Sequence, residues 1–320
     1  HIAEQRSRTL VASAHPSIPG ALHASGNHDH HGSTRDYFNN LLEDAIDKAA
    51  QVERWVSGNS ETFQSLQREH WDFRAADDRH QILLSSLSRH NDADLVQKLL
   101  DAGTRADNYR GCQAVSYAAK NANPKLLDLL LAANASIHAD APKKSFESTC
   151  DALTTAAEWG VPSVVRAILA RHPNVNWQSE RGETALIAAA ENAEKRPDRS
   201  DQDFGVVAQL LIDAGADVNI QGDGYGTQGS ALMQAHSDAA LVRVLLKAGA
   251  KDINTPDSLG DTPLMNSYDP DVTQALLEGG ADPWIVNAEG QTALDIAKKD
   301  DWRNTAPVLE RWMSTHPKRP

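Results

Sequence analysis

A group of histidines near the start of the chain is the first candidate for chemistry. His28, His30 and His31 flank Asp29, and imidazole and carboxylate groups are common metal ligands. A native site needs ligands that a rigid frame holds in place, whereas this segment is rich in Ser, Ala, Gly and Pro and lacks any apolar period. We therefore expect a linker with at most adventitious metal binding, and we predict neither a metal site nor a cofactor.

The two cysteines, Cys112 and Cys150, are the next candidates. Nucleophilic catalysis requires a base and an orienting group beside the nucleophile, and neither cysteine has a base close in sequence. The sequence also lacks a phosphate-binding glycine loop, a His-Glu metal helix and a paired-carboxylate motif. We predict that the protein is not an enzyme and has no catalytic residues.

The composition indicates which elements must position any functional side chain. Hydrophobic residues make up 40% of the chain, but aromatic residues only 5%, and a core rich in Ala and Leu is typical of stacked helices. The formal charge is −13 and no basic stripe is present, which argues against nucleic acid as a partner. No apolar window is long enough to span a membrane.

The chain repeats one two-part pattern. Leu or Val recurs at positions 84, 115, 153, 186, 232, 264 and 294, with spacings scattered around about 33 residues. In the strongest copy, residues 181–190 read Arg-Gly-Glu-Thr-Ala-Leu-Ile-Ala-Ala-Ala, and residues 206–219 follow with Val-Val-Ala-Gln-Leu-Leu-Ile-Asp-Ala-Gly-Ala-Asp-Val-Asn. The helical spacing of the apolar residues, with Thr before the first helix and Gly after the second, predicts a helix-turn-helix unit.

This unit resembles the ankyrin repeat, whose first helix follows Gly-x-Thr-Pro-Leu and whose second carries Val-Val-x-Leu-Leu-Leu before Gly-Ala-Asp. The resemblance covers about residues 80–312. It implies an all-α fold, an ankyrin-repeat solenoid of about seven stacked helix-turn-helix units with β-hairpin-like loops. We assign this ankyrin-repeat domain to residues 80–314. Short turns predict stunted first helices in the fifth and sixth units.

Two further segments precede the repeats, and two insertions interrupt them. We predict an irregular His/Ser/Gly-rich leader at residues 1–35 and a helical N-terminal cap at residues 36–79. The insertions lie near residues 136–149 and 194–204, where a solvated loop and a loop that contacts a partner are both plausible.

The resemblance also bears on the cysteines, which stand just before the Thr-Pro-Leu position of neighbouring units. Ankyrin units stack about 10 Å apart, beyond the roughly 7 Å limit between the Cα atoms of a disulfide. We therefore expect Cys112 and Cys150 to be unbonded. A disulfide remains the alternative if the insertion before Cys150 changes the spacing.

Ankyrin proteins usually bind through a concave groove lined by hairpins and first helices. By repeat position, the candidates in or beside hairpins are Tyr109, Trp177, Tyr225 and Trp284. The candidates on the outward side of first helices are Tyr117, Lys120, Glu158, Trp159 and Glu191. Aromatic side chains at such sites are typical interface anchors, although each one by itself could serve packing alone.

We predict a protein-protein interaction scaffold that binds one specific protein partner through its groove and hairpin loops. One alternative is a bacterial immunity or inhibitor protein that neutralises a toxic enzyme. Another is an effector or enzyme fragment that uses the repeats to recruit substrate. We expect a soluble protein of the cytoplasm or the bacterial periplasm, and the sequence does not predict its oligomeric state.

Overall fold

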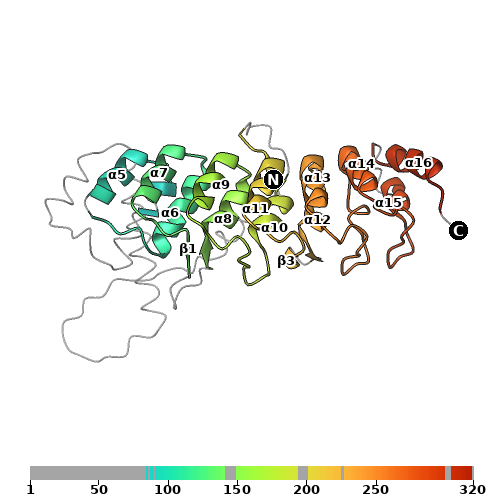
Figure 1. Ribbon diagram of the computed structural model, residues 1–320, viewed down its shortest axis with the longest axis horizontal. Helices are drawn as coiled ribbons and strands as arrows, with labels where there is room; N and C mark the ends of the chain where they lie inside the picture. Colours follow the sequence, from blue (N-terminus) through green and yellow to red (C-terminus); the bar gives the residue numbers. More distant parts are fainter. Residues whose placement is uncertain are drawn as a thin grey trace, which may run out of the picture. The chain divides into compact units, whose positions relative to one another are not determined.

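The computed structural model of the protein shows a mostly helical chain (Figure 1), as the composition predicts. The structure describes residues 84–318, apart from residues 86, 90, 102, 141–148, 194–200, 225–226 and 300–303. The predicted leader, N-terminal cap and histidine group lie outside the described residues.

The described helices form two layers, and they alternate between these layers along the chain except at α13 and α14. Two short strand pairs lie between some of them. The helices of the first layer are α6 (Tyr109–Lys120), α8 (Ala152–Trp159), α10 (Ala185–Glu191), α12 (Ala231–Gln234) and α15 (Ala293–Lys299). Those of the second layer are α5 (Ala93–Asp101), α7 (Pro124–Ala132), α9 (Pro162–Leu169), α11 (Phe204–Asp213), α13 (Ala239–Lys247), α14 (Pro270–Glu278) and α16 (Ala306–Thr315). The strands are β1 (His138–Ala139), β2 (Cys150–Asp151), β3 (Gly222–Gly224) and β4 (Thr227–Gly229).

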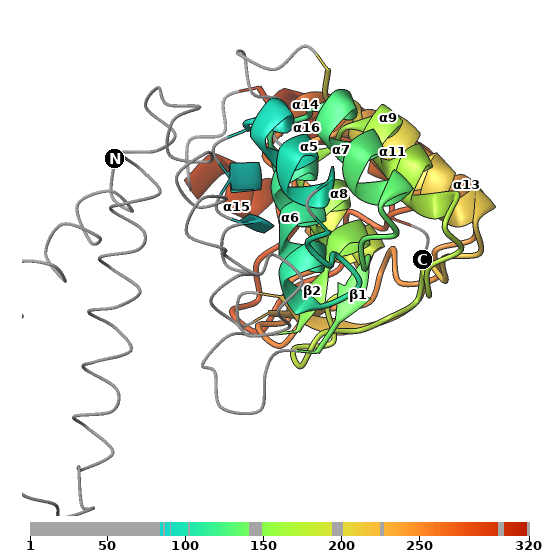
Figure 2. The same cartoon turned by 90° about the vertical axis from the view of Figure 1, so that its left-hand side faces the viewer.

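Each layer is built by contacts between successive units. In the first layer α6 contacts α8, α8 contacts α10 and α10 contacts α12. In the second layer the contacts run from α5 through α7, α9, α11 and α13 to α14 and α16. Figure 2 shows α7, α9, α11 and α13 in one row, with α6 and α8 beside them. The antiparallel pairs β1–β2 and β3–β4 form hairpins, as the repeat pattern predicts.

Side-chain caps determine where the helices begin. The backbone N–H of Ile187 donates to the hydroxyl of Thr184 at 3.2 Å at the start of α10. The N–H of Val206 donates to the Asp203 carboxylate at 2.9 Å at the start of α11. Each cap satisfies a backbone donor that the first helical turn leaves unpaired. After α11, Gly215 adopts a φ of 97°, which favours glycine and closes the helix.

One continuous core lies between the two layers. Leucines of the second helices, such as Leu211 and Leu245, are fully buried. The first helices contribute small side chains, and Ala188, Ala189 and Ala190 are all buried in α10. Small side chains allow neighbouring backbones to approach closely, so each unit buries its apolar face only against its neighbours.

Asparagine side chains join the loops of successive units. Asn176 accepts the backbone N–H of Asp217 at 2.8 Å and donates to the carbonyl of Gly215 at 3.0 Å. In the same way, Asn254 accepts the N–H of Asp282 at 2.7 Å. These bonds satisfy loop backbone groups across the unit boundary and hold the order of the loops.

The predicted stunting of two first helices is confirmed. The helix α12 has 4 residues, and the next unit has a short turn at residues 263–265 instead of a first helix. A buried polar group replaces helical packing there: the hydroxyls of Ser267 and Thr273 lie 2.9 Å apart, and Ser267 donates to the carbonyl of Leu264 at 2.9 Å.

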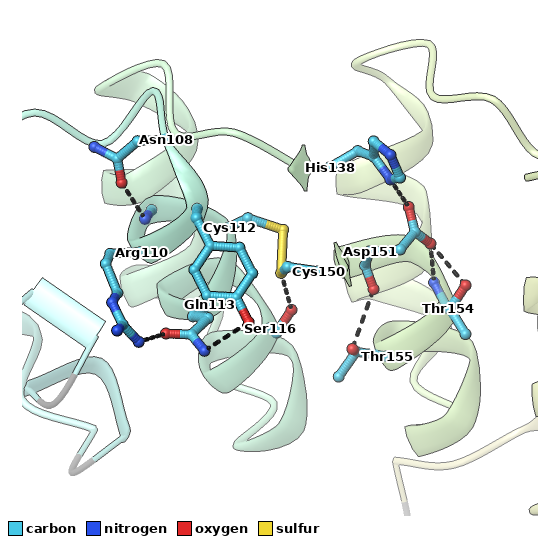
Figure 3. The surroundings of a disulfide bond; sticks show 12 residues. Asn108, Arg110, Cys112, Gln113, Ser116, His138, Cys150, Asp151, Thr154 and Thr155 are labelled. Atoms are coloured by element: carbon cyan, nitrogen blue, oxygen red, sulfur yellow. Dashed lines mark hydrogen bonds and ion pairs between the residues drawn. A yellow bond between two sulfur atoms is a disulfide. The ribbon is translucent and has the colours of Figure 1, made fainter. Parts of the chain in front are cut away.

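The expectation that the cysteines are unbonded is wrong. Cys112 and Cys150 form a disulfide, with Cα atoms 6.1 Å apart (Figure 3). The helix α6 begins one turn earlier than the repeat pattern suggests, because Asn108 caps it. Cys112 therefore lies inside α6, whereas Cys150 lies in β2 just before α8. The two positions are not equivalent, so the separation between equivalent positions does not apply to them.

Candidate functional site

Six of the side chains predicted from repeat position line one pocket. The pocket has a volume of about 650 Å³ and is formed by α6, β2, α8 and the loop at residues 177–183. We call it the α6–α8 pocket. The six predicted residues in its wall are Tyr109, Tyr117, Lys120, Glu158, Trp159 and Trp177.

One face of α6 forms the first wall. Tyr109, Gln113, Tyr117 and Lys120 line the pocket and follow each other at the spacing of three or four residues that places side chains on one helix face. The side-chain amide of Gln113 donates to the Tyr109 hydroxyl at 3.3 Å. The Arg110 guanidinium donates to the side-chain amide oxygen of Gln113 at 2.7 Å, so the start of this wall is held by a chain of polar contacts.

The start of α8 forms the second wall, and Asp151 fixes it. The Asp151 carboxylate accepts the backbone N–H of Thr154 at 2.8 Å and the Thr154 hydroxyl at 2.7 Å. The Thr155 hydroxyl donates to the Asp151 carbonyl at 3.1 Å. These contacts, drawn in Figure 3, set the direction in which α8 leaves β2. Glu158 and Trp159 then reach the pocket from the last turn of α8.

A tight loop between α9 and α10 forms the third wall. The backbone N–H of Ser179 donates to the carbonyl of Glu183 at 2.9 Å, and the N–H of Gly182 donates to the carbonyl of Ser179 at 2.8 Å. Gly182 has a φ of 73°, a conformation that favours glycine. On the strand side, the Trp177 ring meets the His138 ring edge-on, with ring centres 5.0 Å apart.

The disulfide is part of the pocket wall. Cys150 lines the pocket, and its sulfur lies 3.5 Å from the hydroxyl of Ser116 on α6. The bond to Cys112 ties β2 to the first turns of α6. Two walls of the pocket are thus covalently joined, which reduces the number of arrangements they can adopt relative to each other.

The pocket is acidic on balance. Asp151, Glu158, Glu180 and Glu183 line it, against the two cations Lys120 and Arg181. Burial raises the pKa of Glu183, with the charge of Glu158 as the second cause, while Arg181 lowers it. Burial also raises the pKa of Glu191 to about 7, with the charge of Glu183 as the second cause. These carboxylates are therefore close enough to repel each other in surroundings that solvate charge poorly.

One cation of the chain already uses an aromatic wall. The ammonium group of Lys120 lies over the Trp159 ring, 5.0 Å from its centre. A positive charge is attracted to the face of an indole ring by the quadrupole of the ring. The aromatic part of the pocket is therefore suited to organic cations.

Two predicted site residues in the described part of the chain do not line the pocket, and a third lies outside that part. Glu191 ends α10, where one carboxylate oxygen, Oε1, is buried and finds no hydrogen-bond partner among the described residues. Trp284 follows α14 in a loop farther along the chain and is half-buried. Tyr225 lies outside the described residues.

Other residues of the pocket were not predicted. Glu183 lines it. This residue stands next to the Thr that the repeat pattern places at the start of a first helix, so the pattern could have predicted its position. Asp151 had a signal as well, because it precedes the apolar run of α8 as a helix cap does. Gln113 had none, because the repeat pattern placed the start of α6 too late.

None of the described helices combines the length and apolar character that a membrane crossing requires. Within the described residues, no group of three or more metal-ligating side chains comes together.

Comparison with known proteins supports an ankyrin-repeat family. The family model of the ankyrin repeat matches residues 181–223, which include the end of the pocket loop and α10. The count of about seven repeats remains a prediction. Among solved structures, a chain from the complex of a predatory endopeptidase of Bdellovibrio bacteriovorus with an immunity protein is similar to this one. It is 27% identical, with a TM-score of 0.49, over 62% of this chain and 96% of that chain. Because the superposition is loose, no functional conclusion is drawn from it.

Proposed function

We propose that the protein is a scaffold that binds one protein partner through the α6–α8 pocket and the adjoining loops. The observation that carries this proposal is the convergence of six predicted anchor residues from three successive units on one pocket. Ankyrin repeats are typically binding modules, and the repeat match at residues 181–223 overlaps the pocket. We further propose that the repeats form a solenoid of about seven units.

The walls of the pocket suit a protein partner. Aromatic side chains supply contact area at low cost in conformational entropy, and such residues dominate the binding energy of protein interfaces. Their backbones are held by caps, a tight loop and a disulfide. Preorganised walls of this kind lose little freedom when a partner binds.

Recovery of the partner by the intact, tagged chain tests this proposal. Trp159→Ala and Trp177→Ala each remove an aromatic wall and should reduce recovery of the partner at least about tenfold, the effect of losing an interface anchor. Trp284→Ala is the matched control, because Trp284 is half-buried in a loop that does not line the pocket. Undiminished recovery by both pocket variants would contradict the proposal.

A second proposal concerns the compartment. Disulfides persist in oxidising spaces and are rare in the cytosol, so the Cys112–Cys150 bond favours the periplasm or the cell exterior over the cytoplasm. Trapping of free thiols in intact cells tests this: both cysteines should resist alkylation until a reductant is added.

An immunity or inhibitor protein is a narrower form of the same function, favoured by the disulfide because many secreted toxic enzymes act in oxidising spaces. Its test is inhibition of a secreted hydrolase whose gene neighbours the gene of this protein. The remaining hypothesis is an effector or enzyme fragment that recruits substrate. It requires an activity that depends on residues 1–79, which a truncated chain would lose.

A further inference from the structure

Carboxylates and helix ends concentrate negative charge at the α6–α8 pocket. Glu158 lies in the last turn of α8 and Glu191 is the last residue of α10. The carbonyl groups at the C-terminal end of a helix carry partial negative charge, so a carboxylate there is unfavourable and a cation favourable. At the corresponding end of α6 the chain places Lys120. The two units that follow have Glu instead.

The arrangement of these carboxylates has a cost for the folded chain. Glu183 is half-buried and close enough to Glu158 and Glu191 for their charges to interact. Carboxylates that share a partly buried site repel each other, and such arrangements concentrate at functional sites. A cation that enters the pocket beside Glu158 and Glu183 would relieve this repulsion.

The aromatic walls narrow the kind of cation. Tyr109, Tyr117, Trp159 and Trp177 line the same pocket as Glu158 and Glu183. Aromatic faces bind organic cations, and Lys120 over Trp159 is such a contact within the chain. Of the cationic side chains, arginine best meets both kinds of wall, since its planar guanidinium stacks on rings and pairs with carboxylates through two parallel hydrogen bonds.

We propose that the α6–α8 pocket receives the guanidinium group of an arginine side chain of the protein partner, between its aromatic rings and the carboxylates of Glu158 and Glu183. This inference rests on the proposed function and specifies the chemistry that the partner presents. Lys120 is the internal competitor, because its ammonium group occupies the Trp159 ring. Removing the charge of Lys120 should therefore strengthen binding, whereas removing the charges of the carboxylates should weaken it.

Titration of the intact chain with N-acetyl-arginine amide tests the proposal, with the tryptophan indole N–H signals followed by NMR. We expect saturable shifts for Trp159 and Trp177 and none for Trp284, with a millimolar dissociation constant. N-acetyl-citrulline amide has nearly the same shape without the charge and should cause no saturable shift. N-acetyl-lysine amide should bind several-fold more weakly, because it lacks the planar fork. No saturable shift with the arginine probe, or equal binding of citrulline, overturns the proposal, and equal binding of lysine removes the preference for arginine.

Variants of opposite sign separate recognition from a structural role. The double variant Glu158→Gln, Glu183→Gln keeps the shape of both side chains and should weaken arginine binding about tenfold or more, because charge-assisted hydrogen bonds become neutral ones. Lys120→Gln should strengthen binding several-fold by removing a like charge. Weakening in both variants would indicate a merely structural role and contradict the proposal.

The two proposals fail in different ways. If the arginine probe does not bind but partner recovery still depends on Trp159 and Trp177, only the arginine inference is wrong. If the probe binds but the pocket variants recover the partner undiminished, the proposed function is wrong while the cation site stands.

Discussion

The region from α6 to α10 and the region from α12 to α14 are built from the same kind of unit but use its first helix differently. In the former region α6 has 12 residues and α8 has 8, long enough to present a face of aromatic and charged side chains to the pocket. In the latter region α12 has 4 residues, and the next unit has only a turn at residues 263–265.

The two regions are also stabilised by different means. Around the pocket, a disulfide and buried apolar side chains such as Phe204 join neighbouring units. Farther along the chain the apolar core continues, for example at Leu245 and Leu276, and buried polar contacts add to it: the Ser230 hydroxyl donates to Asp252, and Ser267 pairs with Thr273 within one unit. The comparison suggests that a unit needs a first helix of about two turns to present side chains to a binding surface, whereas the shortened first helices only continue the stack.

The largest expected effect tests the apolar joint beside the pocket. Phe204 is fully buried. Its ring packs so closely against Gly160 that a Cβ atom added at Gly160 would lie 2.5 Å from the nearest ring atom. Phe204→Ala should lower the free energy of unfolding by about 4 kcal/mol through lost burial and a cavity. Urea unfolding measures this. Val206→Ala, on the exposed face of the same helix, is the control and should cost less than about 0.5 kcal/mol. Similar losses for both variants would mean that the joint does not depend on Phe204.

Removing the disulfide tests the covalent joint of the pocket. The bond spans a sequence separation of 38 residues, and opening such a loop should cost up to about 4 kcal/mol. Cys112→Ala, Cys150→Ala should unfold at lower urea concentration and should bind the partner more weakly, because two pocket walls separate. Unfolding of the native chain with and without reductant gives the matched comparison. A reductant that leaves the native chain unchanged would contradict this role.

A smaller effect is expected for the polar joint in the second region. The buried Ser267 hydroxyl contacts the Thr273 hydroxyl and the Leu264 carbonyl. Ser267→Ala removes this hydrogen-bond partner from both groups. The loss should be about 1–2 kcal/mol, with partner binding unchanged. Ser258→Ala, at an exposed loop position, is the control. If Ser267→Ala also lost partner binding, this would contradict the hypothesis that binding depends on the first region alone.

The smallest effect concerns the pH dependence of stability near the pocket. Folding raises the pKa of Glu191 from 4.5 to about 7. Between these two pH values the folded chain keeps Glu191 protonated, whereas the unfolded chain has lost that proton. The associated stability is full below about pH 4.5 and is lost as the pH rises through 7.

Glu191→Gln, which stays neutral, should therefore be more stable than the native chain at pH 8, and equal to it near pH 4.5. Because Glu191 is only partly buried, solvent screening reduces the gain to about 1 kcal/mol. Thermal unfolding at the two pH values measures it, with the exposed Glu278→Gln as control. A native chain more stable than the variant at pH 8 would contradict the sign.

Local features of the sequence predicted the helices better than their boundaries. Thr184 and the apolar run after it marked the start of α10 correctly, because a cap and a helical period are properties of a short segment. The start of α6 was misplaced, since Asn108 caps it one turn before the repeat pattern begins. That error made Cys112 and Cys150 seem equivalent and hid the disulfide.

The sequence by itself determined the helical units and six of the residues that line the pocket, because both follow from periodic spacing along the chain. Only the tertiary structure decided which of those residues meet. It brought Trp177 to Trp159 and Lys120 in one pocket and left Trp284 apart. The disulfide and the mutual repulsion of Glu158, Glu183 and Glu191 likewise depend on distances between neighbouring units, which helix lengths and loop paths set and which spacing within a single unit does not encode.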